Sequence, residues 1–417
     1  MPPTDITLGP VQVHSGEFVL PRSKSLANRA LIIQALAPDA VRLSQVGDAE
    51  DVTTMRRLLA QVRDGATLDC GPAGTTFRFL TAYLSTQEGT QTLTGSERML
   101  QRPVGALVQA LRQLGVRIEH LGEEGYPPLS IGHRSPSHSA SVTLAGDVSS
   151  QYLSALMLIG PALDHGLRIE WTGELVSRPY LEMTASLMRH FGAEVDLDDP
   201  YIRVHEQPYT GGEYEIEADW SAASYAAAWC AVGELGTEFN CVGLRQNSLQ
   251  GDHVLTAWIA QWGVETSFHE SGLRFRKTED ISPSTFECDF SSSPDLAQTF
   301  SVLCACTGTT GLFSGLQTLR IKETDRIEAL KTELAKVQVY LSKLPPRFSP
   351  NSEREYYMQE GLATWTDKVE VNTYDDHRMA MALSLLASRG CVSVKNASVV
   401  GKSFPQFWES LRTVGAS

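Results

Sequence analysis

One supersecondary pattern returns six times along the chain, and this recurrence constrains the fold more than any other feature. Each copy consists of a short strand, a break at glycine or another small residue, a polar loop and an amphipathic helix. The first two copies lead into helices expected at residues 52–59 and 104–114. Recurrence at this scale indicates copies of one unit. The simpler alternative is the ordinary alternation of strands and helices in an α/β protein.

The later copies divide the chain into halves. They lead into helices expected at residues 180–190, near 254–261, after the loop at 322–326, and at 406–414. The glycine-containing stretch 233–237 separates the third copy from the fourth, which suggests two similar domains of three copies each. A length of 417 residues also favours two or three domains. Residues 225–232 are apolar nearly all round, so a central, buried helix is expected there.

The segment 319–330 places a cation in the first turn of an expected helix. Asp325 fits an N-cap and Glu328 its capping-box partner, so Arg326 lies where the helix dipole disfavours positive charge. A bound anion facing the arginine would remove this cost.

Three further segments repeat this arrangement of a helix start and an arginine. Ser25 is the expected N-cap before Arg29, and Thr75 the expected N-cap before Arg78. Arg378 follows Asp375 and Asp376 in the same way. A single case would be read as a solvated charge near a helix end. Four cases in one chain favour a protein that binds small polyanions.

The composition indicates which kinds of partner the protein can bind and in which cellular compartment it is expected. The net charge of −14 argues against nucleic acid as the main partner. Seven cysteines without paired spacing indicate a reducing compartment, and Cys304 and Cys306 lie in an apolar run typical of buried residues. The ten histidines form no ligand-spaced cluster. No signal segment or membrane-spanning run is present, so a cytoplasmic protein is expected.

The motifs together resemble the 5-enolpyruvylshikimate-3-phosphate synthase family over nearly the whole chain and in the family's order. The motifs that carry this resemblance are Lys24-Ser-Leu-Ala-Asn-Arg29, Ala73-Gly-Thr75, Ser149-Ser-Gln151, Lys322-Glu-Thr-Asp-Arg326, Asp376-His-Arg-Met-Ala380 and Lys402-Ser-Phe-Pro405. The Lys-Glu-Thr-Asp-Arg and Asp-His-Arg-Met-Ala motifs are highly specific, whereas the Ser-Ser-Gln motif alone is a weak signal.

The resemblance implies an α/β (α+β) fold, the two-domain enolpyruvyl transferase fold or inverse α/β barrel. Each domain is expected to contain three βαβαββ repeats, with a double chain crossing between the domains. The domain on the C-terminal side is expected to combine residues 1–20 with 219–417. It is expected to carry the catalytic carboxylates and the side that binds the donor substrate, phosphoenolpyruvate. The other domain is expected at 21–218, on the shikimate 3-phosphate side.

The resemblance also implies a reaction. The carboxyvinyl group of phosphoenolpyruvate moves to the 5-hydroxyl of shikimate 3-phosphate with release of phosphate, the penultimate step toward chorismate and the aromatic amino acids. The implied partners are these two small molecules, with no nucleic acid, membrane, metal or organic cofactor. A monomer is expected.

The residues that match the family's binding positions fall into two sets. Those matching contacts to shikimate 3-phosphate are Lys24, Ser25, Arg29, Ser149, Ser150, Gln151, Ser177, Tyr180, Asp295 and Lys322. Those matching contacts to phosphoenolpyruvate are Lys24, Gly74, Arg102, Gln151, Arg326, Arg378 and Lys402.

The catalytic positions implied by the resemblance are Asp295, Glu323 and Lys24. Asp295 matches the family's proposed base and Glu323 a proposed proton donor. An acid and a base need surroundings that separate their pKa values, and Lys322 beside Glu323 could help to do so. His377 is a further candidate for proton transfer, although a histidine in a first turn is more often structural. Residue identity alone does not decide the proton route.

Four positions depart from the family's pattern. Arg22 replaces a common glycine, Pro72 a usual asparagine, and Phe79 a frequent proline. Thr318 stands where an asparagine often contacts shikimate 3-phosphate. None of these departures removes a charged catalytic position.

Two other functions compete with this interpretation. UDP-N-acetylglucosamine 1-carboxyvinyltransferases share the fold and the donor, but usually carry a cysteine on a loop before the Arg-Pro helix. Residues 94–103 contain no cysteine, and the Asp-His-Arg-Met-Ala motif is foreign to that family. A non-catalytic anion-binding protein with this fold would be favoured if Lys24, Asp295, Glu323 or Lys402 were missing, and all four are present.

Overall fold

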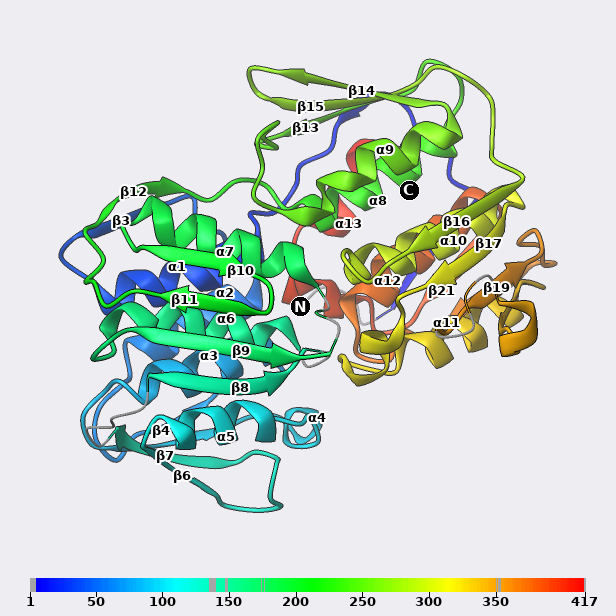
Figure 1. The fold of residues 1–417 in the computed structure, drawn as a ribbon. Helices are drawn as coiled ribbons and strands as arrows, with labels where there is room; N and C mark the ends of the chain where they lie inside the picture. The colour runs from blue at the N-terminus through cyan, green and yellow to red at the C-terminus, as the bar shows by residue number, and fades with distance from the viewer. Residues whose placement is uncertain are drawn as a thin grey trace. The chain divides into compact units, whose positions relative to one another are not determined.

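The chain forms two compact units, and its N-terminal segment belongs to the unit that contains the C-terminal half. The computed structural model describes residues 5–134, 140–146, 149–173, 175, 177–349, 351 and 354–415. Unit 1 combines Met1–Pro21 with Glu217–Ser417, and unit 2 is Arg22–Ile216. The chain therefore passes twice between the units, once after Pro21 and once after Ile216 (Figure 1).

Unit 2 contains three sheets and a set of helices between their strands. Its helices are α1 (Lys24–Leu36), α2 (Glu50–Leu59), α3 (Gly74–Leu84), α4 (Glu97–Leu100), α5 (Gly105–Gln113), α6 (Ser150–Ile159), η1 (Gly160–Ala162) and α7 (Arg178–His190). Its strands are β3 (Val41–Ser44), β4 (Thr67–Asp69), β5 (Thr90–Thr94), β6 (Val116–His120), β7 (Leu129–Arg134), β8 (Ser141–Ala145), β9 (Leu167–Thr172), β10 (Val195–Asp198), β11 (Tyr201–Val204) and β12 (Gly212–Glu215).

Unit 1 is built in the same way. Its α-helices are α8 (Trp220–Ala231), α9 (Leu255–Ile259), α10 (Ala297–Thr307), α11 (Arg326–Ala335), α12 (His377–Ser384) and α13 (Phe407–Thr413). Its 3-10 helices are η2 (Gly251–Val254), η3 (Ala260–Trp262), η4 (Pro294–Leu296), η5 (Gln317–Ile321), η6 (Pro346–Phe348), η7 (Leu385–Ser388) and η8 (Ala397–Lys402). Its strands are β1 (Ile6–Leu8), β2 (Gly16–Glu17), β13 (Glu238–Val242), β14 (Val264–His269), β15 (Gly272–Lys277), β16 (Thr285–Asp289), β17 (Thr310–Ser314), β18 (Tyr340–Lys343), β19 (Tyr357–Glu360), β20 (Lys368–Val371) and β21 (Cys391–Val394).

The sheets repeat one strand order. In the orders β4-β5-β7-β6, β8-β9-β11-β10, β16-β17-β19-β18 and β2-β13-β15-β14, the first pair is parallel and the remaining pairs are antiparallel. The other described sheets are β1-β21-β20 and β12-β3. Each unit thus contains three of the described sheets, as three repeats per domain require. None of the described sheets closes into a ring of strands.

The N-terminal segment completes two sheets of unit 1. Ile6–Leu8 pairs antiparallel with β21, where Ile6 lies opposite Val394. Gly16 lies opposite Phe239, so β2 extends the sheet that contains β13. These strands are separated by more than two hundred residues of sequence, and their pairing fixes the N-terminal segment to unit 1.

The most apolar helices form the centre of each unit. Every residue of α8 is buried, which confirms the central helix expected at 225–232. The predicted burial of Cys304 and Cys306 in α10 is also confirmed. In unit 2, α1, α3 and α6 contact one another and are buried over most of their length. In the described part of the chain, no helix combines the length and apolarity needed to cross a bilayer.

Three predicted helix starts are wrong in detail. The N-cap of α1 is Ser23, whose Oγ accepts from Leu26 N, so Ser25 lies inside the first turn. The N-cap of α3 is Ala73, and the Thr75 hydroxyl accepts instead from Gln151 Nε2 at 3.1 Å. At α11, Asp325 is the N-cap as predicted, but the Glu328 carboxylate pairs with Lys331 at 3.0 Å and closes no capping box.

Candidate active site

Unit 1 brings a group of predicted site residues into one network of alternating charges. The network contains Asp295 on η4, Glu323 before α11, Arg326 at the start of α11, Asp376 and Arg378 at the start of α12, and Lys402 at the end of η8. Its cations and carboxylates come from segments that are far apart in sequence and meet where helices begin or end.

Arg326 lies at the centre of this network. Its Nε donates to Asp376 Oδ2 at 2.7 Å, its Nη1 to Asp295 Oδ1 at 3.2 Å, and its Nη2 to Glu323 Oε2 at 3.0 Å. Only 1 % of the residue is exposed. Burial alone would lower the pKa of the guanidinium, but the carboxylates of Asp376, Glu323 and Asp295 outweigh it and raise this pKa above its ordinary value. Arg326 therefore stays charged.

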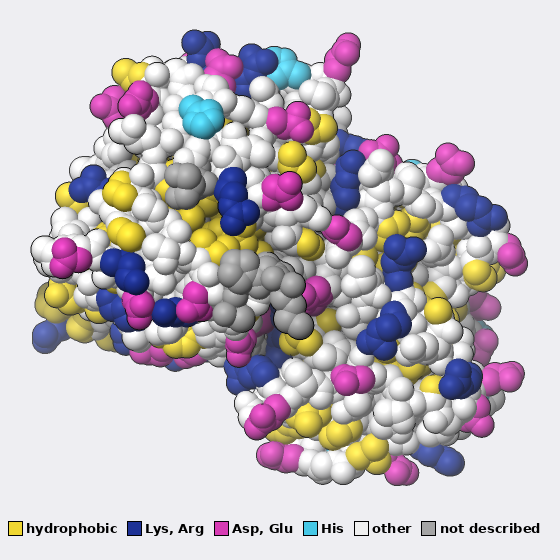
Figure 2. All heavy atoms as spheres, turned by 180° about the vertical axis from the view of Figure 1, so that it is seen from behind, with side chains coloured by type: hydrophobic (Ala, Val, Ile, Leu, Met, Phe, Trp, Pro, Cys, Tyr) yellow, Lys and Arg dark blue, Asp and Glu magenta, His cyan; other side chains and the backbone are white. Residues whose placement is uncertain are grey.

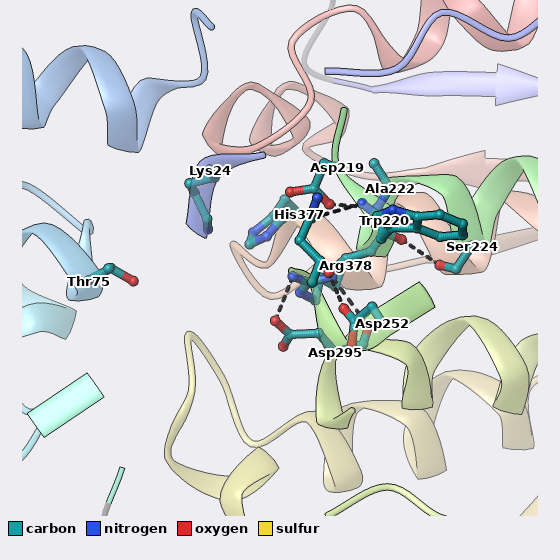
Figure 3. A network of polar contacts seen from close by, with 12 residues as sticks. Lys24, Thr75, Asp219, Trp220, Ala222, Ser224, Asp252, Asp295, His377 and Arg378 are labelled. Atoms are coloured by element: carbon teal, nitrogen blue, oxygen red, sulfur yellow. Dashed lines mark hydrogen bonds and ion pairs between the residues drawn. The ribbon is translucent and has the colours of Figure 1, made fainter. Parts of the chain in front are cut away.

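The two carboxylates that match catalytic positions each connect two cations. Asp295 accepts from Arg326 and, through Oδ2, from Arg378 Nη2 at 2.7 Å. Glu323 accepts from Arg326 and, through Oε1, from Lys402 Nζ at 2.7 Å. Figure 3 shows Arg378 directed toward Asp295. The cations hold both carboxylates in defined orientations.

Asp376 organises the start of α12 and was missing from the predicted site set. Its Oδ1 accepts from Arg378 N at 2.9 Å as the N-cap, and both of its oxygens accept from Arg326. The sequence signal that could have indicated Asp376 is its position directly before the helix that begins at His377, because aspartate is a preferred N-cap. His377 is buried beside it, with Nδ1 at 3.8 Å from Asp376 Oδ1.

Two buried side chains border this network. Burial raises the pKa of the Asp252 carboxyl to about 6, and the neighbouring charge of Asp295 acts in the same direction. The Ser221 hydroxyl donates to Asp252 Oδ2. Burial also raises the pKa of the Tyr225 hydroxyl to about 12. Lys322, which was predicted to contact shikimate 3-phosphate, is half-buried at the end of η5.

In unit 2, two arginines converge on the start of α3. A Cβ atom at Gly74 would lie 2.5 Å from Arg102 Nη1 and 2.7 Å from Arg78 Nη1, so a larger residue would force these guanidinium groups to shift. Arg78 and Arg102 are both buried. The helix has no side-chain cap, because its N-cap is Ala73. Uncapped backbone N–H groups beside two guanidinium groups form an arrangement that suits an anion.

Lys24 and Gln151 each have a defined partner within unit 2. Lys24 Nζ lies 3.1 Å from Asp51 Oδ2, in an ion pair whose carboxylate is buried. Gln151 Nε2 donates to Thr75 Oγ1, which links the first turns of α6 and α3. Asp51 was not predicted, because nothing in the sequence near residue 51 indicates its distant partner.

Four residues of unit 2 that were predicted to contact shikimate 3-phosphate lie at helix starts. Ser149 is the N-cap of α6 and accepts from Gln151 N at 3.4 Å, with Ser150 as the first helical residue. Ser177 is the N-cap of α7 and adopts φ 58° and ψ 37°, a left-handed conformation that is uncommon for serine. Tyr180 follows in the first turn, and its backbone N–H donates to Ser177 O at 3.1 Å.

Arg29 lies deeper, at the contact of three helices. Its Nε donates to Thr184 Oγ1 at 2.7 Å, its Nη1 to Ser25 O at 2.9 Å and its Nη2 to Ser154 Oγ at 3.2 Å. Burial lowers the pKa of this guanidinium to about 10. On the face drawn in Figure 2, by contrast, Lys and Arg side chains are interspersed with Asp and Glu and form no large area of one sign.

Comparison with known proteins identifies a family. Residues 60–411 match the family described as EPSP synthase (3-phosphoshikimate 1-carboxyvinyltransferase). A 3-phosphoshikimate 1-carboxyvinyltransferase of Bacteroides fragilis is 43% identical over 407 residues, covering 95% of this chain and 94% of that protein. One of Bordetella parapertussis is 35% identical over 433 residues, covering 94% of each chain.

A solved structure shares the fold. EPSP synthase from Acinetobacter baumannii superimposes with a TM-score of 0.77 at 19% identity, covering 99% of this chain and 98% of the other. The agreement supports the two-domain enolpyruvyl transferase fold expected from the motifs. With a family match over most of its length and relatives above 30% identity, the chain belongs to the EPSP synthase family.

Proposed function

We propose that the protein transfers the carboxyvinyl group of phosphoenolpyruvate to the 5-hydroxyl of shikimate 3-phosphate and releases phosphate. The observation that carries this proposal is the network in which Arg326, Arg378 and Lys402 surround the carboxylates of Asp295 and Glu323. It joins cations suited to an anionic donor with two carboxylates suited to proton transfer. Membership of the EPSP synthase family supports the same assignment.

The donor set is proposed to use both kinds of anion site described above. Arg326, Arg378 and Lys402 supply charge-assisted hydrogen bonds in unit 1. Gly74 and Arg102, together with Lys24 and Gln151, supply the contacts of unit 2, where the uncapped start of α3 favours negative charge. Arg78 is proposed as an addition to this set, because its Nη1 would lie 2.7 Å from a Cβ atom at Gly74, against 2.5 Å for Arg102 Nη1.

The acceptor set is proposed to hold shikimate 3-phosphate mainly through helix starts of unit 2. The members of this set in unit 2 are Lys24, Ser25, Arg29, Ser149, Ser150, Gln151, Ser177 and Tyr180. Hydroxyl groups and backbone N–H groups at helix starts suit a phosphate. Asp295 and Lys322 are the proposed contributions of unit 1.

The reaction needs one proton removed and one delivered. The 5-hydroxyl loses its proton as its oxygen attacks C2 of phosphoenolpyruvate, and the methylene carbon gains a proton to become a methyl group. Loss of phosphate and of a methyl proton from the tetrahedral intermediate then restores the double bond. Asp295 is proposed as the base for the hydroxyl, and Glu323 as the proton donor to the methylene carbon. Lys24 is proposed to stabilise the developing negative charge.

Phosphate release with each acceptor tests the assignment. Release from phosphoenolpyruvate is expected with shikimate 3-phosphate and not with UDP-N-acetylglucosamine, and a chelator should leave the rate unchanged. Activity with the nucleotide sugar alone, or loss of activity with the chelator, would contradict the proposal.

Three broader properties are proposed with this function. The activity belongs to the shikimate pathway, whose product chorismate leads to the aromatic amino acids. The protein is proposed to work in the cytoplasm, which is supported by seven cysteines that are all free. It is also proposed to be a monomer, which light scattering at several protein concentrations would test.

A further inference from the structure

Arg29 is a buried cation that meets no carboxylate among the residues the structure describes. Only 2 % of it is exposed, and its hydrogen-bond partners among these residues are the neutral oxygens of Thr184, Ser25, Ser154 and Tyr180. Arg326 is equally buried but has three carboxylate partners. Burying a charge without an opposite charge is costly. The environment of Arg29 must therefore favour the cation by other means.

Two aromatic rings provide such an environment. The Arg29 Cζ lies 5.3 Å from the ring centroid of Phe79 on α3 and 5.9 Å from that of Tyr180 on α7. The negative face of an aromatic ring attracts a guanidinium, most strongly where water is excluded. Phe79 is itself buried, so its ring both attracts Arg29 and keeps water away from it.

The same guanidinium is attached to two residues of the proposed acceptor set. Arg29 Nη1 donates to Ser25 O at 2.9 Å, and Nη2 lies at 3.5 Å from Tyr180 O. The Thr184 hydroxyl, which accepts from Arg29 Nε, also donates to Tyr180 O at 2.7 Å. A rotation of the guanidinium would thus disturb the starts of both α1 and α7.

Arg29 also has one N–H group that can donate a hydrogen bond to a ligand. A guanidinium has five N–H donors in a fixed plane. Described residues accept four bonds from it, two of them from Nη2 and one each from Nε and Nη1. Five donors minus four bonds leave one N–H on Nη1, on the side of Ser25. This N–H group, and the lack of a carboxylate partner among the described residues, indicate that Arg29 binds an anionic group of shikimate 3-phosphate.

We propose that Phe79 is a positioning residue for the acceptor, which holds the Arg29 guanidinium so that it can bind an anionic group of shikimate 3-phosphate. This inference rests on the proposed function. Proline is frequent at this position in the family's motif, and proline offers no aromatic face.

The test compares Phe79→Leu with Phe77→Leu. Both phenylalanines are buried on α3, but the cation contacts of the described residues involve Phe79 and leave Phe77 out. Both substitutions remove the same atoms from the same core, so similar losses of thermal stability are expected. Phe79→Leu should raise the KM and the calorimetric Kd for shikimate 3-phosphate roughly tenfold. Its kcat and its KM for phosphoenolpyruvate should stay within about twofold of the wild-type values, and Phe77→Leu should change none of these constants.

A ring-retaining variant and a milder variant keep the test decisive. Phe79→Tyr preserves the aromatic face and should restore the KM to near the wild-type value. If Phe79→Leu does not fold, Phe79→Met, whose unbranched side chain adapts better to an irregular gap, should show the same selective rise in KM. An equal KM for the wild type and the folded Phe79→Leu or Phe79→Met variant, or equal changes in Phe77→Leu and Phe79→Leu, would overturn the inference.

Acceptor analogues identify the anionic group. Shikimate lacks the phosphate, and the carboxamide of shikimate 3-phosphate lacks the carboxylate. The effect of Phe79→Leu on binding should disappear with whichever analogue lacks the group that Arg29 binds, and an equal effect with both analogues would contradict a direct role of Arg29. If the wild-type protein does not bind shikimate 3-phosphate, the proposed function itself fails. If the wild type binds and Phe79→Leu binds equally well, only the present inference fails.

Discussion

Arg326 and Asp376 form an ion pair across fifty residues of sequence, with Arg326 Nε 2.7 Å from Asp376 Oδ2 and both side chains buried. The pair joins the start of α11 to the start of α12. Because Asp376 also accepts from Arg378 N, one carboxylate orients both arginines that contact Asp295. The geometry of the charged network therefore depends on a residue that is proposed to touch neither substrate.

Asp376→Ala should destabilise the protein strongly. The substitution leaves Arg326 buried with two of its three carboxylates and removes the N-cap of α12. Breaking a buried pair on one side costs about 3–5 kcal/mol. Urea denaturation should show this loss in the free energy of unfolding.

Asp325→Ala is the matched control for the loss of a cap. Asp325 is the N-cap of α11 and accepts from Ile327 N and Glu328 N. Its removal should cost about 0.5–2 kcal/mol. Equal losses in the two variants would show that the pair with Arg326 adds nothing beyond capping.

Arg378→Ala and Lys402→Ala should each weaken donor binding. Each removes a charge-assisted hydrogen bond, worth about 1.5–3 kcal/mol, so the KM for phosphoenolpyruvate should rise roughly tenfold or more. The measurement is phosphate release with phosphoenolpyruvate varied at saturating shikimate 3-phosphate. Lys395→Ala is the control, because Lys395 also belongs to unit 1 but pairs with Asp5 and Glu370 at the surface. Unchanged donor constants in both site variants would place the donor elsewhere.

Asp295→Asn and Glu323→Gln should separate chemistry from binding. Each keeps the shape of the side chain and removes its ability to exchange a proton, so kcat should fall by roughly 10²–10⁴. Calorimetric binding of shikimate 3-phosphate should persist.

Glu333→Gln is the control for a buried carboxylate without a catalytic role. Glu333 is fully buried on α11, where it accepts from Lys336, Asn372 N and the Tyr374 hydroxyl. Its substitution should lower stability and leave kcat near the wild-type value. Near-normal turnover in both the Asp295 and the Glu323 variants would mean that other groups move the protons.

Local patterns in the sequence were sufficient to predict the central helix α8 and the N-cap of α11. Helix α8 shows why, since a helix that is apolar on all sides is expected inside a core. Asp325 was predicted as an N-cap because a capping carboxylate bonds to N–H groups only two or three residues away.

Contacts between distant segments were not predictable in this way. Thr75 offers a capping hydroxyl, but it accepts from Gln151 of another helix, and α3 begins after its N-cap Ala73 without a side-chain cap. The pairing of β2 with β13 and the pair Arg326–Asp376 likewise join segments whose proximity depends on the whole fold. Local propensity says nothing about such partners.

The buried carboxyl of Asp252 should make stability depend on pH. Its pKa is raised from 3.8 to about 6, first because burial disfavours the charged form and second because Asp295 is close. Between about pH 4 and pH 6 the folded protein then binds more protons at this site than the unfolded chain does. The contribution of Asp252 to the free energy of unfolding is therefore greatest at low pH, and it is lost as pH rises through about 6.

Asp252→Asn removes this titration and keeps an oxygen that can accept from Ser221. The difference in unfolding free energy, variant minus wild type, should become more positive between pH 4 and pH 7, by up to roughly 3 kcal/mol for a shift of about two pKa units. Urea denaturation at several pH values measures it. Asp39→Asn changes the net charge equally at an exposed position and should give a nearly constant difference over this range. A pH-independent difference for Asp252→Asn would show that this carboxyl titrates alike in the folded and the unfolded protein.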